Sequence, residues 1–162
     1  MSKKEKKKNK EALNEEKQIV IINNIQSPSE SGPEYRTASL YGDITESSAS
    51  DLVSNLLFLE RTAPVVTPED PEDPESDMVQ YNRDMRVVIS TNGGIASEMF
   101  AIIDVMNSIK KNTCDIETLA IGKVMSAGVP VLASGTKGKR KIGKNCRVMI
   151  HSVNGGSVGE LH

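Results

Sequence analysis

The sequence is poor in aromatic residues and histidine, holds only two cysteines, and has no long hydrophobic run. Aromatic residues make up 3% of the chain and tryptophan is missing, so the core must consist of Ile, Val, Leu, Met and Ala. No apolar stretch is long enough to span a bilayer, and none directly follows the Lys-rich start. We therefore expect neither a membrane helix nor a secretory signal. The composition predicts a soluble, cytoplasmic protein.

Few residues suit metal or nucleic-acid binding. The histidines are His151 and His162, and the cysteines, Cys114 and Cys146, are 146 − 114 = 32 residues apart, whereas a metal site needs several convergent ligands. Two cysteines fit a reducing compartment, in which both are expected to pack as small hydrophobes. The Lys-rich start lacks the interleaved aromatic residues on which bases stack. We expect no metal, no cofactor, no nucleic-acid partner and no membrane partner.

Length and charge favour one domain behind a solvated leader. The chain has 162 residues and a formal net charge of −2, which suits a single domain. Residues 1–17 contain seven Lys and four Glu, so 1–34 is interpreted as a Lys-rich tail and flexible leader. Residues 64–77 hold four prolines and six acids without a basic residue, which predicts an exposed, disordered insertion. The folded domain is assigned to 35–162.

Hydrophobic periodicity predicts strands that alternate with helices. Short β-branched runs indicate strands, and apolar residues spaced three and four apart indicate helices. Such alternation is typical of an α/β domain with parallel strands. The expected strands cover residues 37–40, 86–90, 114–121, 139–142 and 147–151, and the expected helices cover 45–60, 97–110 and 126–134.

Ser126 is a candidate nucleophile. Amide hydrolysis needs a nucleophile, a base to take its proton, and donors for the developing oxyanion. Ser126 follows a predicted strand and begins a predicted helix, where unpaired backbone N–H groups favour negative charge. Pro130 is tolerated only in a first helical turn, which supports a helix start near Ser126. The same position equally suits an ordinary serine cap.

Gly93-Gly94 and His151 are candidates to assist Ser126 in catalysis. Each of them also suits a purely structural role. A glycine pair after a strand marks a tight turn, and it also exposes backbone N–H groups to a ligand, as one half of an oxyanion hole does. The run from Asn92 to Gly94 matches neither the dinucleotide nor the P-loop spacing. His151 ends an apolar strand, where it suits either a structural role or that of a general base.

Three stretches together resemble the ClpP family of ATP-dependent serine proteases. Leu56-Leu57-Phe58-Leu59-Glu60 is similar to the first-helix signature, and Ile89-Ser90-Thr91-Asn92-Gly93-Gly94 to the strand and Ser-Pro-Gly-Gly turn. The third stretch comprises Ile121-Gly122-Lys123-Val124-Met125-Ser126-Ala127-Gly128, the hairpin Lys137-Gly138-Lys139-Arg140, and Arg147-Val148-Met149-Ile150-His151. The likeness runs from about Arg36 to Glu160, apart from the acidic insertion.

The resemblance implies a role for particular residues. Ser126 would be the nucleophile, and His151, 151 − 126 = 25 residues later, its general base. The backbone N–H groups of Gly94 and Ala127 would form the oxyanion hole. Gly155-Gly156 would bind extended peptide by strand addition.

The resemblance also implies a fold and partners. The fold would be a ClpP/crotonase-like α/β spiral of β-α units with layered, mostly parallel sheets. The subunits would form a homo-oligomer of stacked heptameric rings, and an AAA+ unfoldase would feed polypeptide substrates into its chamber.

Several features depart from the family pattern. Asn92 stands where the family has Pro, and the Lys-rich tail does not look like the family's axial-loop segment. The printed sequence ends at His162, before the positions of the family's triad Asp and of the C-terminal handle that joins the two rings. We therefore expect weak peptidase activity, or activity that depends on a further portion.

Other readings remain open at this point. The chain could be a non-catalytic ring subunit or scaffold, or a phage head-maturation protease with the same fold. A crotonase-like acyl-CoA enzyme needs no serine nucleophile, so the pair Ser126 and His151 argues against it. A Ser-Lys peptidase related to signal-peptide peptidases would lack its membrane segment here.

Overall fold

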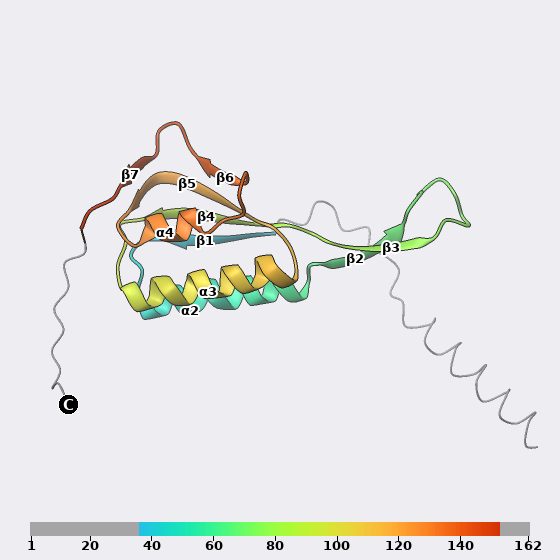
Figure 1. The fold of residues 1–162 in the computed structure, drawn as a ribbon, viewed down its shortest axis with the longest axis horizontal. Coiled ribbons are helices and arrows are strands. Elements are labelled where there is room, and N and C mark those ends of the chain that lie inside the picture. Colours follow the sequence, from blue (N-terminus) through green and yellow to red (C-terminus); the bar gives the residue numbers. More distant parts are fainter. Residues whose placement is uncertain (1–35, 153–162) are drawn as a thin grey trace, which may run out of the picture. The chain divides into compact units, whose positions relative to one another are not determined.

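A computed structural model describes residues 36–152 and shows a parallel sheet with helices packed on it (Figure 1). The strand order is β1-β4-β5, and both β6 and β7 pair with the outer edge of β5. Every pairing in this sheet is parallel, as the alternation of strands and helices predicts. The strands are β1 (Thr37–Tyr41), β4 (Met85–Thr91), β5 (Ile116–Met125), β6 (Arg140–Ile142) and β7 (Arg147–Met149).

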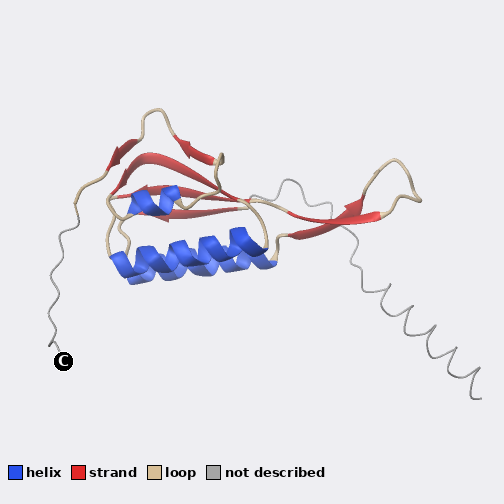
Figure 2. Cartoon of the chain, in the orientation of Figure 1, coloured by secondary structure: helices blue, strands red, loops and turns tan. Residues whose placement is uncertain are grey.

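In residues 36–152, three helices accompany the sheet. The two long ones lie side by side on one of its sides (Figure 2). They are α2 (Glu46–Arg61) and α3 (Ala96–Asn112), and the short α4 (Gly128–Ala133) packs against β5 and α3. The buried core consists of alternate strand residues and one face of each long helix. Its largest fully buried members include Leu40, Val87, Ile89 and Ile116 from the strands, and Leu52, Leu56, Ile102, Met106 and Ile109 from the helices.

Local sequence explains where α2 begins. Thr45 precedes the helix in an extended conformation, and its hydroxyl accepts a hydrogen bond from the Ser48 N–H. The Ser48 hydroxyl in turn accepts from the Thr45 N–H at 2.9 Å, so two otherwise unpaired donors are satisfied. Thr45 is thus the N-cap of α2.

The strand β5 is longer than predicted, because it continues through Gly122. The pairing of β4 with β5 shifts register between Ile89 and Thr91, so the bulged segment absorbs extra residues of β5. Gly122 has a φ of 60°, which favours glycine and lets the strand bend without ending. Sequence alone treats a glycine as a stop, whereas here it marks a bulge.

The stretch Lys137-Gly138-Lys139-Arg140 forms a turn that leads from α4 into β6, with a hydrogen bond from the Lys139 N–H to the Thr136 carbonyl at 2.9 Å. β6 and β7 run in the same direction and pair with successive parts of β5, in registers that begin Thr118↔Arg140 and Lys123↔Arg147. Ion pairs support this edge: Lys139 bridges Asp84 and Asp115. The hydrogen bond from Lys139 holds the pKa of Asp115 below its usual value.

The expectation of a disordered loop over 64–77 is wrong for its first five residues. Pro64–Pro68 forms β2, which pairs antiparallel with β3 (Met78–Asn82) in a separate two-stranded sheet. Both prolines lie at the strand's ends in an exposed two-stranded arm, where a missing N–H is tolerated, and the three residues between them are Val, Val and Thr. The acidic residues 69–77 form the turn between these strands.

Arg36 holds the base of this hairpin. Its guanidinium donates to the Thr62 carbonyl and hydroxyl, both at 3.0 Å, and to the carbonyls of Asp84 and Leu59. The residue is only 7% exposed, so these bonds form largely away from water. They connect the start of β1 to the end of α2 and to the chain just before β4.

Among the helices of residues 36–152, none is both long enough and apolar enough to cross a membrane.

Candidate active site

The candidate residues meet at one edge of the main sheet because they follow strands that run in parallel. Asn92-Gly93-Gly94 follows β4, Ser126 follows β5, and His151 comes two residues after β7. The carboxyl ends of parallel strands are the common position for ligand sites in α/β sheets. The parallel pairing of β7 with β5 sets Met149 beside Met125, which brings the two following segments together.

Ser126 lies in a sharp turn between β5 and α4. Its φ of 51° is the one positive value outside glycine in the described chain, and a side chain in this left-handed region is strained. The Ser126 N–H donates to the Met149 carbonyl at 2.9 Å, which fixes the turn against β7. The predicted helix from 126 to 134 is shorter in the structure and begins at Gly128, so Ser126 itself is not helical.

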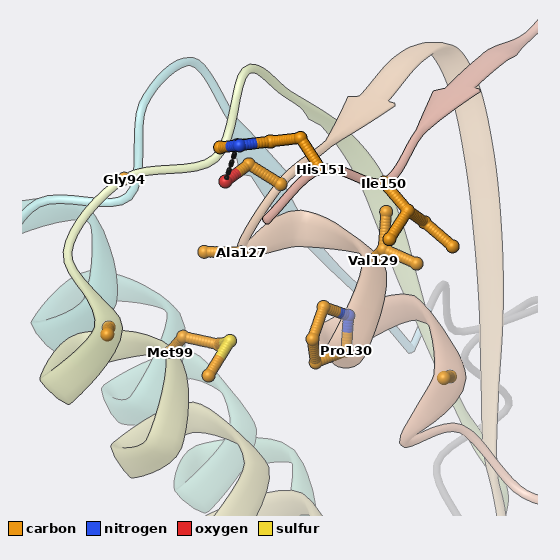
Figure 3. A pocket seen from close by; sticks show the side chains of 10 residues that line it. Gly94, Met99, Ala127, Val129, Pro130, Ile150 and His151 are labelled. Carbon is orange, nitrogen blue, oxygen red and sulfur yellow. Dashed lines mark hydrogen bonds between the residues drawn. The ribbon is translucent and has the colours of Figure 1, made fainter. Parts of the chain in front are cut away.

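The His151 ring contacts the Ser126 hydroxyl directly. Nε2 of His151 and Oγ of Ser126 are 2.8 Å apart (Figure 3), a normal distance for a hydrogen bond between a base and a nucleophile. Within residues 36–152, no carboxylate is hydrogen-bonded to the His151 ring. The structure therefore brings together the predicted pair, and the described chain supplies no orienting acid.

Glycine at 93 and 94 permits the close approach of the β4 turn. A Cβ added to Gly93 would lie 2.6 Å from Cβ of Ser126, and one added to Gly94 would lie 2.2 Å from the Ile44 carbonyl oxygen. Both distances are shorter than real Cβ contacts, so only glycine fits here without displacement. The predicted tight turn thus lies against the serine turn.

Two backbone N–H groups beside this site, those of Gly94 and Ala127, have no hydrogen-bond partner within residues 36–152. Ile44 accepts from the Ile95 N–H at 2.9 Å and donates to the Gly93 carbonyl at 2.8 Å. This parallel bridge uses the backbone groups on either side of the Gly94 N–H, and that N–H itself has no partner among the residues that the structure describes. Likewise, no hydrogen bond inside the described range uses the Ala127 N–H. Gly94, Ala127, Ser126 and His151 all line one cavity.

That cavity has a volume of about 630 Å³ and is mostly apolar. In Figure 3, Met99 from α3 faces Pro130 from α4 across it, and His151 lies at its upper end. A cleft of this size is typical of a small-ligand site. Its apolar side chains are Ala96, Met99, Ala127, Val129, Pro130, Ala133 and Ile150.

Within the part of the chain that the structure describes, the cysteines and acidic residues form no second candidate site. Cys114 and Cys146 are both free, and burial raises the pKa of the Cys114 thiol, so this thiol stays protonated. Cys114 belongs to the core, and half-buried Cys146 packs against it. No group of three or more potential metal ligands occurs in residues 36–152. Gly155 and Gly156, the predicted peptide-binding residues, lie outside the described residues.

Sequence reasoning missed several contributors to the site. Met99 and Ile150 were predicted only as residues of a helix face and a strand, yet they line the cavity. The Thr91 hydroxyl accepts from the Gly93 N–H at 3.0 Å, a side-chain turn that a Thr two residues before a Gly signals. Nothing local signals the contact of Asp43 with Asn92, because 49 residues separate them.

Known proteins match this chain over its fold and its site. The Clp protease family model matches residues 76–162, more than half of the chain. The crystal structure of the ClpP protease catalytic domain from Plasmodium falciparum is similar, with 35% sequence identity and a TM-score of 0.57. The match covers 72% of this chain and 55% of that one, so the chain spans about half of the length of this relative. The chain belongs to the Clp protease family.

Proposed function

We propose that this chain carries the nucleophile, general base and oxyanion hole of a serine endopeptidase. The observation that carries the proposal is the 2.8 Å contact between Ser126 Oγ and His151 Nε2. Beside this contact lie the backbone N–H groups of Gly94 and Ala127, which have no partner within residues 36–152. Ser126 Oγ attacks the scissile carbonyl while His151 Nε2 takes its proton. The N–H groups of Gly94 and Ala127 donate to the oxygen that becomes negative.

The second half of the reaction uses the same groups. Protonated His151 gives its proton to the leaving amine, and the acyl group remains on Ser126. Water then attacks this ester with His151 again as base, and the acid product leaves. The strain at Ser126 supports the role, because a nucleophile at a sharp turn projects from the backbone toward substrate.

The substrate and assembly follow from family membership and remain part of the proposal. Polypeptide would bind in extended form along the strand edge near β7 and the predicted Gly155-Gly156 segment. Members of the family act as oligomers, so we propose a homo-oligomeric ring, heptameric by resemblance, with an AAA+ unfoldase as feeding partner.

Fluorophosphonate labelling tests the proposed function. A fluorophosphonate labels a serine whose hydroxyl is activated by a base and whose site stabilises negative charge on the oxygen of the attacked group. We expect labelling of the intact chain, with the adduct located on Ser126 by mass spectrometry, and none in Ser126→Ala. Ser97→Ala, which removes an exposed hydroxyl on α3, serves as the matched control and should label normally. A folded wild-type protein that stays unlabelled would contradict the proposal and favour a non-catalytic ring subunit.

The cavity predicts a preference for apolar side chains on the acyl side of the cleaved bond. A charged side chain would lose its hydration against Met99, Val129 and Ile150 without gaining a partner. We expect kcat/KM for activated esters of N-acyl leucine or methionine to exceed that for aspartate by about 10²-fold.

Ala133 offers a way to change this preference. It is exposed at the end of α4 and lines the cavity, so Ala133→Lys places a cation at the rim. This variant should narrow the leucine-to-aspartate ratio by about two- to fivefold, the worth of an exposed ion pair. Ala133→Met, of similar length but uncharged, should leave the ratio unchanged. If both variants changed the leucine-to-aspartate ratio equally, the length of the new side chain and not its charge would be responsible.

A further inference from the structure

We infer that the side-chain hydrogen bond between Asn92 and Asp43 is a clamp that positions the oxyanion-hole turn. Asn92 Nδ2 donates to Asp43 Oδ1 at 2.9 Å. Asn92 directly precedes Gly93-Gly94, and Asp43 directly precedes Ile44, whose backbone bonds to the same turn. Both are therefore positioning residues, and the inference rests on the proposed function.

Asp43 is itself anchored, which a clamp requires. The Ser48 hydroxyl donates to the Asp43 carbonyl at 2.8 Å, and Ser48 belongs to the capping box of α2. The next residue, Ile44, is fully buried. The Asp43 carboxylate thus extends from a segment that both the helix start and the core hold in place.

The turn needs such support because its own residues restrict it little. Gly93 and Gly94 have φ values of 96° and 152°, and glycine populates many other conformations at little cost. Rotation of the peptide between them would turn the Gly94 N–H away from the substrate oxygen. Inside the described range, the turn is tied by the Ile44 backbone, by Thr91 within its own strand, and by Asn92 to Asp43.

The clamp should act on the transition state more than on substrate binding. The Gly94 N–H stabilises charge that develops only during attack, so weaker positioning lowers kcat while KM stays nearly constant. We expect Asn92→Ala and Asp43→Ala each to lower kcat by about 2- to 10-fold, the rate equivalent of one intramolecular hydrogen bond.

A charge-exchange series distinguishes a clamp from general destabilisation. Asp43→Asn keeps an oxygen acceptor and should retain most of kcat. Asn92→Asp sets two carboxylates against each other and should lose at least as much as Asn92→Ala. The double variant Asp43→Asn with Asn92→Asp restores a donor and an acceptor in exchanged positions, and it should recover kcat. Asp51→Ala, which removes an exposed carboxylate of α2, is the matched control.

The assay is Ser126-dependent hydrolysis of an activated ester, with kcat, KM and Tm measured for each variant. Unchanged kcat in both alanine variants, or a double variant no faster than Asn92→Asp, would overturn the inference. If wild type and Ser126→Ala hydrolyse the ester equally, the proposed function fails, and amide hydrogen exchange over residues 92–95 decides on the clamp. Faster exchange in Asp43→Ala but not in Asp43→Asn supports it, and identical exchange in both rejects it.

Discussion

His151→Ala is expected to lower kcat for Ser126-dependent ester hydrolysis by about 10²–10⁴-fold, the usual contribution of a positioned general base. The imidazole lies 2.8 Å from the hydroxyl whose proton must leave, and a serine alcohol without a base is a poor nucleophile at neutral pH. Residual turnover should remain, because the Gly94 and Ala127 donors do not depend on the ring. Steady-state kinetics with an activated ester measures the effect.

Two controls separate the loss of the base from other causes. His151 is exposed in the described structure, so its removal should leave Tm nearly unchanged, and added imidazole should restore part of the lost rate through the open cleft. Lys123→Ala tests the competing Ser-Lys chemistry, since Lys123 lies on β5, three residues before Ser126 in the sequence. Retained turnover in His151→Ala together with its loss in Lys123→Ala would assign the base to lysine instead.

The sheet and its helices could be predicted because their signals are local. β4 and α3 carry unbroken β-branched or helical periodicity, and Thr45 carries a capping pattern, so propensity and burial agree there. The hairpin of β2 and β3 was not predicted, because a high content of proline and acidic residues indicates that a segment is exposed but not whether it pairs with another strand. The strand β2 forms only because Val65 and Val66 pair with residues of β3. The same holds for β6 and β7, whose direction depends on which part of β5 each one reaches.

In the candidate site too, some features have local sequence signals and others depend on tertiary structure. Ser126 and Gly94 each had a structural explanation in isolation, and the resemblance, not the spacing, gave them roles. Their convergence depends on parallel pairing of β4, β5 and β7, which sequence periodicity supports but does not specify in register. The Asn92 contact depends on β1 lying beside β4, so it is a consequence of tertiary structure. Asn92 stands where the resemblance places a proline, and its side chain donates to Asp43, in the segment that follows β1.

Arg36→Met is expected to lower the free energy of unfolding by about 3–5 kcal/mol, because several carbonyls at a buried position lose a charged hydrogen-bond donor. Methionine can replace the apolar stem of the side chain, but it cannot donate to the carbonyls of Leu59, Thr62 and Asp84. Hydrogen bonds to charged groups contribute about 1.5–3 kcal/mol each. The Thr62 carbonyl would still accept a hydrogen bond from Arg83, so the loss of stability at that carbonyl should be smaller.

Urea unfolding of wild type, Arg36→Met and Arg86→Met measures this effect with a matched control. Arg86 lies on β4 beside Arg36, and its N–H donates to the Arg36 carbonyl. Its side chain, however, is 49% exposed and pairs with Glu117. Replacing it should therefore lower the free energy of unfolding by less than about 1 kcal/mol. Equal losses in the two variants would show that the buried position of Arg36 confers no special stability. Arg36 lies at the end of β1 opposite to Asp43 and the serine turn, so the folded fraction of Arg36→Met should still label at Ser126. Stability and chemistry would then be separable at opposite ends of one sheet.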